Sequence, residues 1–204
     1  EHVEGIGVEK NDVEAAKWCR KAAEQGVAEA QYNLGELHAF GHGVAKSSKW
    51  AAKWYRKAAE QGHAAAQANL GVAYLEGIGV EQNDAEAVKW FRKAAEQGDS
   101  CAQSNLGLAY ALGRGVGKNE AEGVIWFRKA AEQGVAGAQR NLGLAYEQGL
   151  GVEQNDEEAL TWFRKAAEQG HAAAQANLGE AYAGGRGVEK NEAEALAWYR
   201  KAAE

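Results

Sequence analysis

Residues 66–98 read AQANLGVAYLEGIGVEQNDAEAVKWFRKAAEQG, and this stretch decides the fold because the chain repeats it. Trp90 recurs with a spacing of 36 residues, and so do Asn69 and the segment 92–96. No insertion or deletion interrupts this register along the 204 residues. Self-similarity at a fixed period of this length predicts a repeat architecture, in which neighbouring repeats share a continuous core. The recurring tryptophans are Trp18, Trp54, Trp90, Trp126, Trp162 and Trp198.

Each repeat is predicted to contain two helices, of which the first is called helix A. In the first complete repeat, helix A is expected over residues 28–40, because its apolar positions from Ala30 through Leu34 to His38 share one helical face. Gly41 follows, and glycine readily adopts the left-handed conformation that ends a helix. In later repeats a tyrosine takes the place of His38, namely Tyr74, Tyr110, Tyr146 and Tyr182.

Helix B follows a Gly-x-Gly-Val loop and starts with a capping signature. Asn83 is placed to cap the helix, and Glu86 is expected to bond back to the Asn83 backbone in a capping box. The expected buried face centres on Trp90 and Phe91, and Gly98 is expected to end the helix. A single residue then precedes the next helix A, which predicts antiparallel neighbours. The capping pair recurs as Asn11/Glu14, Asn119/Glu122, Asn155/Glu158 and Asn191/Glu194.

These repeats predict an all-α protein, a right-handed α/α superhelix (α-solenoid) of stacked helix-turn-helix repeats, because neither helix can bury its apolar side alone. We expect one domain over residues 1–204. Neither end carries a polar capping helix and residue 1 is not methionine, so we expect a segment of a longer protein. The expected repeats are a partial one at 1–27, which opens in the tail of a helix A at residues 1–4, full ones at 28–63, 64–99, 100–135 and 136–171, and a last one at 172–204.

The chain resembles, over essentially its whole length, the Sel1-like repeat family, a relative of the tetratricopeptide repeat with a longer loop between its helices. The resemblance implies an α/α superhelix and adaptor roles, which include complex assembly, signalling, bacterial envelope or secretion functions, and membrane-associated quality control in eukaryotes. A cysteine-rich bacterial branch is linked to penicillin binding, but its paired cysteines are missing here, so its activity is not carried over. The resemblance rests on Ala66-Gln67-x-Asn69-Leu70-Gly71-x-Ala73-Tyr74-x-x-Gly77-x-Gly79-Val80, followed by Ala87-x-x-Trp90-x-x-Lys93-Ala94-Ala95-x-x-Gly98.

Composition excludes several classes of partner. A net charge of −6 and a pI of about 5.5 argue against nucleic-acid binding and against docking on anionic membranes. No apolar run approaches the roughly 20 residues of a membrane span, so no integral membrane segment is expected. Cys19 and Cys101 lie more than two repeats apart, which rules out a disulfide framework. We expect a soluble protein, either cytoplasmic or exported.

Comparison of the repeats with one another separates folding from recognition. Positions that are identical in every repeat serve the fold, whereas variable positions are free to be tuned to a ligand. The variable positions of helix A share the side opposite its apolar face, and in tetratricopeptide relatives this side lines a concave groove. The predicted groove residues, repeat by repeat, are Glu29, Tyr32, Glu36 and Phe40; Ala68, Val72, Leu75 and Glu76; Ser104, Leu108 and Leu112; Arg140, Leu144 and Glu147; and Ala176, Glu180 and Ala183.

The predicted groove is apolar in its middle and acidic towards both ends, a pattern typical of a surface that binds an amphipathic helix or an extended peptide. We therefore expect a protein–protein interaction scaffold or adaptor, without enzyme activity or cofactor. For Val72 and Leu108, packing between neighbouring A helices is an equally good interpretation. The alternatives are a structural module that self-associates end to end through uncapped terminal repeats, and an enzyme of the cysteine-rich type.

An asparagine that precedes the buried leucine of each helix A is a second candidate for recognition. Its amide pairs with both the C=O and the N–H of an extended peptide, as an asparagine does at this position in related repeats. The other interpretation is a tether to the neighbouring repeat, which the constancy of the residue along the chain favours. These residues are Asn33, Asn69, Asn105, Asn141 and Asn177.

No catalytic or metal-binding constellation is found in the sequence. His38 and His42 have a spacing that can bind zinc on a helix, but Gly41 ends the helix between them and no third ligand follows. The Gly-x-Gly loops follow a helix rather than a strand, so they do not match the dinucleotide-binding fingerprint. We expect Cys19 to be a small core residue, with Cys101 at a variable position of helix A.

Trp50 departs from the repeat pattern, because every other repeat has glutamate at this position. Residues 45–49 before it also break the usual Glu-Gln-Asn-Asp form of the loop. Two interpretations follow: Trp50 is an exposed anchor for a partner, or it folds over a neighbouring loop, which we favour.

A glutamate in place of a leucine at the predicted groove distinguishes a binding surface from a core. We expect Leu108→Glu or Leu144→Glu to abolish partner binding and to leave the helical content unchanged, as measured by far-UV circular dichroism. Loss of the helical signal would instead mean that these leucines belong to the core.

Overall fold

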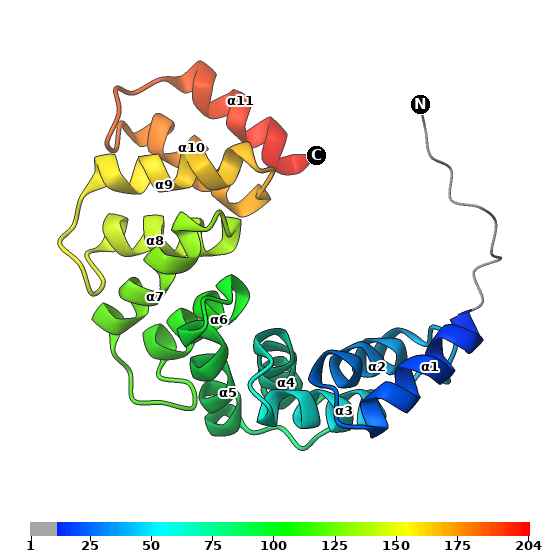
Figure 1. Cartoon of the computed structure of the whole chain (residues 1–204). Coiled ribbons are helices and arrows are strands. Elements are labelled where there is room, and N and C mark those ends of the chain that lie inside the picture. Colours follow the sequence, from blue (N-terminus) through cyan, green and yellow to red (C-terminus); the bar gives the residue numbers. More distant parts are fainter. Residues whose placement is uncertain (1–11) are drawn as a thin grey trace. The chain divides into compact units, whose positions relative to one another are not determined.

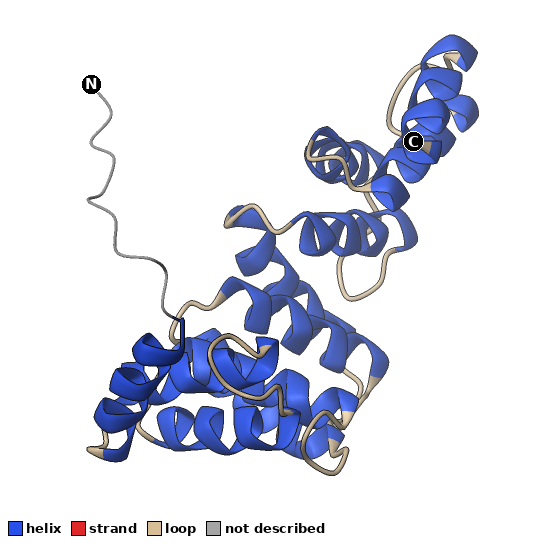
Figure 2. Cartoon of the chain, turned by 90° about the vertical axis from the view of Figure 1, so that its right-hand side faces the viewer, coloured by secondary structure: helices blue, strands red, loops and turns tan. Residues whose placement is uncertain are grey.

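The computed structural model describes residues 12–204, which form helices and loops and contain no strand (Figure 2). None of the described helices is long and apolar enough to span a membrane. The helix A tail expected at residues 1–4 and the cap expected at Asn11 lie outside the described residues. The helices are α1 (Asp12–Glu24), α2 (Ala28–Phe40), α3 (Ser48–Glu60), α4 (Ala64–Glu76), α5 (Asp84–Glu96), α6 (Ser100–Leu112), α7 (Glu120–Glu132), α8 (Ala136–Gln148), α9 (Asp156–Glu168), α10 (Ala172–Gly184) and α11 (Glu192–Ala203) (Figure 1).

The helices form two compact units, an N-terminal unit (Glu1–Ala94) and a C-terminal unit (Ala95–Glu204). Even-numbered helices are the predicted A helices and odd-numbered ones the B helices, and the bounds predicted for the first A helix coincide with α2. Packing is most extensive between an A helix and the B helix that follows it, as in α2–α3, α6–α7, α8–α9 and α10–α11. The predicted all-α arrangement of stacked helix-turn-helix repeats is confirmed in each unit.

Each A–B pair closes on a glycine of the A helix. A Cβ added to Gly71 would lie 2.6 Å from the ring of Phe91, and one added to Gly35 would lie 2.5 Å from the ring of Tyr55. Such distances are far shorter than van der Waals contact, so the ring occupies the space that a side chain would need. The same contact joins Gly107 to Phe127, Gly143 to Phe163 and Gly179 to Tyr199.

The core of each repeat lies between the leucine of helix A and the alanine and aromatic residues of helix B. Trp90 and Phe91 of α5 are buried, as predicted. The ammonium of Lys93 lies 4.6 Å from the centroid of the Trp90 ring, a cation–π contact that covers the outer edge of the core. The fully buried leucines are Leu34, Leu70, Leu106, Leu142 and Leu178.

A buried glutamine of helix A links three successive helices, a role that was not predicted from the sequence. The Nε2 of Gln139 donates to the carbonyl of Ala131 at 3.1 Å, in the last turn of α7, where carbonyl groups lack a helical partner. The Oε1 of Gln139 accepts from the Nε2 of Gln169 at 2.7 Å, just after α9. The recurrence of this glutamine in every helix A is the sequence feature from which this role could have been predicted. The equivalent residues are Gln31, Gln67, Gln103, Gln139 and Gln175.

Only one of the two hydrogen bonds of the predicted capping box forms at the start of helix B. The backbone N–H of Glu86 donates to the Oδ1 of Asn83 at 3.0 Å. The backbone N–H of Asn83, however, donates to the carbonyl of Tyr74 at 2.9 Å, so the predicted return bond from Glu86 is wrong. The loop folds back on the end of helix A and uses this donor there. The same backbone bond joins Asn119 to Tyr110, Asn155 to Tyr146 and Asn191 to Tyr182.

The second glycine of each interhelical loop fixes the position of that loop on the preceding repeat. Gly77 ends α4 with a φ of 71°, as predicted for the left-handed cap, and Gly79 follows with a φ of 74°. A Cβ on Gly79 would lie 2.2 Å from the carbonyl oxygen of Ser48, at the start of α3. A side chain at this position would therefore collide with the backbone of the preceding repeat. A tight turn by itself would require only a positive φ at Gly79 and not the absence of a side chain.

Two glycine substitutions distinguish the cost of a positive φ from the cost of a steric clash with the preceding repeat. Gly62 also has a positive φ, of 92°, but a Cβ there would meet nothing within 4 Å. We expect Gly62→Ala to lower the free energy of unfolding by about 1–2 kcal/mol through backbone conformation alone. Gly79→Ala should cost at least about 3 kcal/mol, because overpacking adds to the same conformational cost. Urea unfolding followed by circular dichroism measures both, and equal losses would contradict the proposed contact.

Candidate partner-binding pockets

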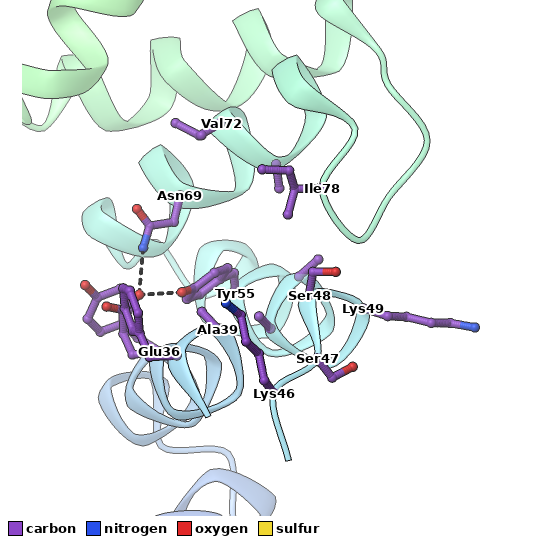
Figure 3. Close-up of a pocket in the computed structure, with 15 residues that line it drawn as sticks. Glu36, Ala39, Lys46, Ser47, Ser48, Lys49, Tyr55, Asn69, Val72 and Ile78 are labelled. Atoms are coloured by element: carbon purple, nitrogen blue, oxygen red, sulfur yellow. Dashed lines mark hydrogen bonds between the residues drawn. The ribbon is translucent and has the colours of Figure 1, made fainter. Parts of the chain in front are cut away.

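The variable residues of α2 and α4 line a pocket in the N-terminal unit. We call it the N-terminal pocket; its volume is about 810 Å³, and it lies between α2 and α4 against α3 (Figure 3). Residues from the altered loop before α3 also line it, so the loop that the sequence marked as unusual belongs to this cavity. The lining residues used below are Tyr32, Glu36, Phe40, Lys46, Ser48, Tyr55, Asn69, Val72 and Ile78.

A second pocket occupies the equivalent place in the C-terminal unit, two repeats further along the chain. This C-terminal pocket lies between α6 and α8 against α7, and its volume is about 270 Å³. The two cavities are formed by corresponding residues, so they occupy the same position in their repeats. The correspondence pairs Glu36 with Leu108, Phe40 with Leu112, Lys46 with Lys118, Ser48 with Glu120, Tyr55 with Phe127, Asn69 with Asn141, Val72 with Leu144 and Ile78 with Leu150.

The N-terminal pocket holds a carboxylate that is fixed by two donors. The hydroxyl of Tyr55 donates to the Oε1 of Glu36, and the Nδ2 of Asn69 donates to the same oxygen at 3.0 Å (Figure 3). The ring of Tyr32 stacks on that of His63 with centroids 4.7 Å apart and lies 6.0 Å from the ring of Tyr55. Glu36 is half-buried, so its carboxylate is held in one orientation at the side of the cavity.

Burial raises the pKa of Tyr55 above its ordinary value, and the hydrogen bond to Glu36 and the negative charge of that residue raise it further. Tyr55 therefore stays protonated over the physiological range and acts as a donor to Glu36.

The structure brings nine of the predicted site residues into the two pockets. Tyr32, Glu36, Phe40, Asn69 and Val72 meet in the N-terminal pocket. The C-terminal pocket collects Leu108, Leu112, Asn141 and Leu144. The contributions of the loop and of helix B, above all those of Tyr55, Lys46 and Ile78, were not predicted from the sequence.

Three of the other predicted groove residues have a partner within the chain, and two of them, Arg140 and Glu147, tie neighbouring repeats together. The Nε of Arg140 donates to the Oδ1 of Asn177 at 3.0 Å, from α8 to α10. The carboxylate of Glu147 lies 2.6 Å from the Nη1 of Arg186 and its side chain is only 14% exposed. Glu180 lies 3.7 Å from the Nη2 of the same arginine. Each of the three thus has a partner within the chain, and their role in binding an external partner stays a prediction. Leu75 is half-buried and lines neither pocket.

The asparagines of the A helices do not all act alike. Asn69 bonds Glu36 of the preceding A helix, and Asn177 accepts from Arg140, so both tether neighbouring repeats. Asn33 and Asn105 bond within their own helices, to the Oε1 of Glu29 at 3.4 Å and the carbonyl of Cys101 at 3.0 Å respectively. Asn141 lines the C-terminal pocket and forms no hydrogen bond with its amide in the described part of the chain.

The apolar residues of the pockets differ in exposure. Phe40 is 63% exposed, Leu112 64% and Leu108 42%. Val72 is half-buried. Leu144 is also half-buried and packs against the core cluster of α9 and α10, so a charge there would disturb folding as well as binding. Leu108 is therefore the better test of the surface.

Other residues that the sequence singled out lie away from any catalytic geometry. The Nδ1 of His38 is 3.2 Å from the carbonyl oxygen of Ala45, and its buried ring lies 6.2 Å from the ring of Trp50. Trp50 thus packs on α2 and keeps 47% of its surface exposed. Cys19 is half-buried, where burial raises the pKa of its thiol, and Cys101 is exposed. Among residues 12–204, no three His, Cys, Asp or Glu side chains gather as metal ligands.

Comparison with known proteins confirms the resemblance. The Sel1 repeat pattern matches residues 1–27, 28–63, 64–99, 102–135, 136–171 and 172–204. A protective antigen present in uropathogenic Escherichia coli strains, which displays an SLR fold, is 42% identical with a TM-score of 0.91 over 98% of this chain and 43% of its own. The chain thus spans less than half of that antigen.

Two further solved structures place the fold among bacterial proteins. A Sel1 repeat protein from Oxalobacter formigenes is 37% identical with a TM-score of 0.84, over 96% of this chain and 83% of its own. An immunity protein from Pseudomonas aeruginosa shares the fold alone, at 23% identity and a TM-score of 0.56 over 96% of this chain and 75% of its own. A comparison with curated protein sequences found no match.

The raised pKa of Tyr55 predicts an alkaline loss of stability. Above about pH 10 the unfolded chain loses the Tyr55 proton while the folded chain keeps it, so ionisation favours the unfolded state. The free energy of unfolding should therefore fall with rising pH by up to about 1.4 kcal/mol per pH unit from this residue. Urea unfolding at pH 8 and pH 11 measures the slope, and Tyr55→Phe should reduce it. An unchanged slope in Tyr55→Phe would contradict the raised pKa of Tyr55.

Proposed function

The chain belongs to the Sel1 repeat family, and we propose that it is a scaffold that binds a segment of another protein in its two A-helix pockets. The observation that carries this proposal is that one cavity occurs twice, at corresponding positions of the repeat, and that residues which vary between repeats line it both times. A fold requires constant residues at its packing positions, whereas a binding surface is free to vary. The variable residues meet in cavities large enough to take side chains.

The exposed rims of the pockets support binding of apolar groups. Phe40 and Leu112 stand at corresponding places and are 63% and 64% exposed. A Leu or Phe side chain that is fully buried on binding contributes about 1.5–3 kcal/mol. A helix or an extended segment with two anchor residues is the partner that we propose.

We also propose that the chain binds without catalysing a reaction. The polar groups that meet in the N-terminal pocket hold one another: Tyr55 is a protonated donor, and Glu36 accepts from it and from Asn69. Such an arrangement orients a carboxylate for recognition. A protective antigen and an immunity protein share this fold, and such roles involve recognition of another molecule.

A peptide selection tests the scaffold proposal directly. We expect a phage library of random peptides to yield ligands of the wild-type chain, and Leu108→Glu and Leu112→Glu to weaken those that use the C-terminal pocket by at least about tenfold, because each places a charge against an apolar anchor. Isothermal titration with the synthetic peptides measures the affinity.

The matched control is Ile125→Glu, which removes an apolar side chain of similar exposure, 48%, on α7 outside the pocket. Ile125→Glu should bind as the wild type does. If all three variants bind the selected peptides equally well, the pockets are not the binding surface.

A further inference from the structure

The two pockets differ at two positions that change together. Glu36 and Tyr55 in the N-terminal pocket correspond to Leu108 and Phe127 in the C-terminal pocket. The other repeats follow the same rule, so a tyrosine stands on helix B where a glutamate stands on helix A, and a phenylalanine where the residue is aliphatic. The remaining pairs are Val72 with Phe91, Leu144 with Phe163 and Glu180 with Tyr199.

The fold itself does not require the carboxylate of Glu36. Leu108 fills the corresponding place in the C-terminal pocket without disturbing the repeat. A charge in a half-buried position carries a desolvation cost, which the hydrogen bonds from Tyr55 and Asn69 offset in part. Both donors reach the same oxygen, Oε1, so Oε2 accepts from no residue in the described part of the chain. One carboxylate oxygen thus remains available to a ligand.

No cation within the described residues neutralises this carboxylate. Lys46 lines the same pocket from the loop but forms no ion pair with Glu36. In the C-terminal pocket the corresponding Lys118 pairs with Glu120 at 2.8 Å, and Ser48 stands in place of that glutamate in the N-terminal pocket. The negative charge of Glu36 is therefore open to a cation from outside.

The walls around Glu36 suit the stem of a long cationic side chain. The ring of Tyr32 is held by its stacking on His63, and Phe40 at the rim is largely exposed. Aromatic rings attract cations through their faces and offer apolar surface to the methylene groups of Lys and Arg. A net charge of −6 also favours encounters with a basic partner.

We propose that the N-terminal pocket binds a lysine or arginine side chain of the partner, whose cationic end pairs with Glu36. The C-terminal pocket, which lacks the carboxylate, takes an aliphatic or aromatic side chain. This inference rests on the proposed function and specifies its partner, a segment that carries one basic and one apolar anchor.

Titration with blocked amino acids tests the two pockets separately. The probes are N-acetyl-arginine amide and N-acetyl-leucine amide, added to the ¹⁵N-labelled chain, and the readouts are the side-chain amide signals of Asn69 and Asn141. We expect the arginine probe to shift the Asn69 signal and the leucine probe to shift the Asn141 signal. Each asparagine reports on its own pocket because it lines that pocket.

Variants that exchange the two chemistries sharpen the test. Glu36→Gln keeps the shape and an acceptor oxygen but removes the charge, so the dissociation constant of the arginine probe should rise by at least about tenfold. The double variant Glu36→Leu with Tyr55→Phe should lose the arginine probe and gain the leucine probe at Asn69. The reverse exchange, Leu108→Glu with Phe127→Tyr, should bring the arginine probe to Asn141. Unchanged backbone signals of the other repeats show that each variant is folded.

Several results would overturn the inference. Equal binding of the arginine probe to Glu36→Gln and to the wild type is one. Another is binding of N-acetyl-glutamate amide at Asn69 that Lys46→Ala abolishes, because this would mean an acidic partner residue. If the leucine probe still reaches Asn141 in these cases, the scaffold proposal stands while this inference fails. If no probe shifts either asparagine signal, both fail.

Discussion

The rest of the structure depends on the contact between a glycine of each A helix and an aromatic ring of the following B helix. A Cβ on Gly35 or Gly71 would lie within 2.6 Å of the ring, so glycine alone allows the two helices to approach this closely. This contact fixes the position of the B helix along the A helix. It thereby also fixes which side chain of helix B lies next to the residue that follows the glycine. Glu36 follows Gly35, which is why the hydroxyl of Tyr55 reaches its carboxylate.

The same contact allows the repeats to differ in chemistry without differing in fold. The ring of Tyr55 fills the same space as that of Phe127, and the hydroxyl is the atom that distinguishes them. Constant ties hold the repeats together elsewhere, through the buried glutamines and the loop glycines such as Gly79. Because each repeat contacts its neighbours alone, a change at position 36 or 108 affects one pocket and not the whole chain. A scaffold built in this way can give each pocket a different preference.

Much of the fold follows from the sequence, and less of the site does. The 36-residue register, the bounds of α2 and the faces of α5 depend on local helical periodicity, which a single sequence displays. One of the two hydrogen bonds of the capping box predicted at Glu86 is absent. The backbone N–H of Asn83 donates instead to the carbonyl of Tyr74, because the loop folds back on the end of helix A. Glu147 and Glu180 were assigned to the groove, but both lie beside Arg186, which periodicity could not place near them. The bond between Tyr55 and Glu36 joins residues of different helices, and its sequence signal was the paired change to Phe127 and Leu108.

The central claim is that these rings lie on the glycines in solution, and the chemical shifts of the glycine α-protons test it most directly. A proton held against an aromatic face is shifted upfield and shows nuclear Overhauser contacts to the ring. We predict both effects for Gly35 with Tyr55 and for Gly71 with Phe91. Gly62, where an added Cβ would meet nothing within 4 Å, should keep an ordinary shift. Ordinary shifts at Gly35 and Gly71, without contacts to the rings, would contradict the account.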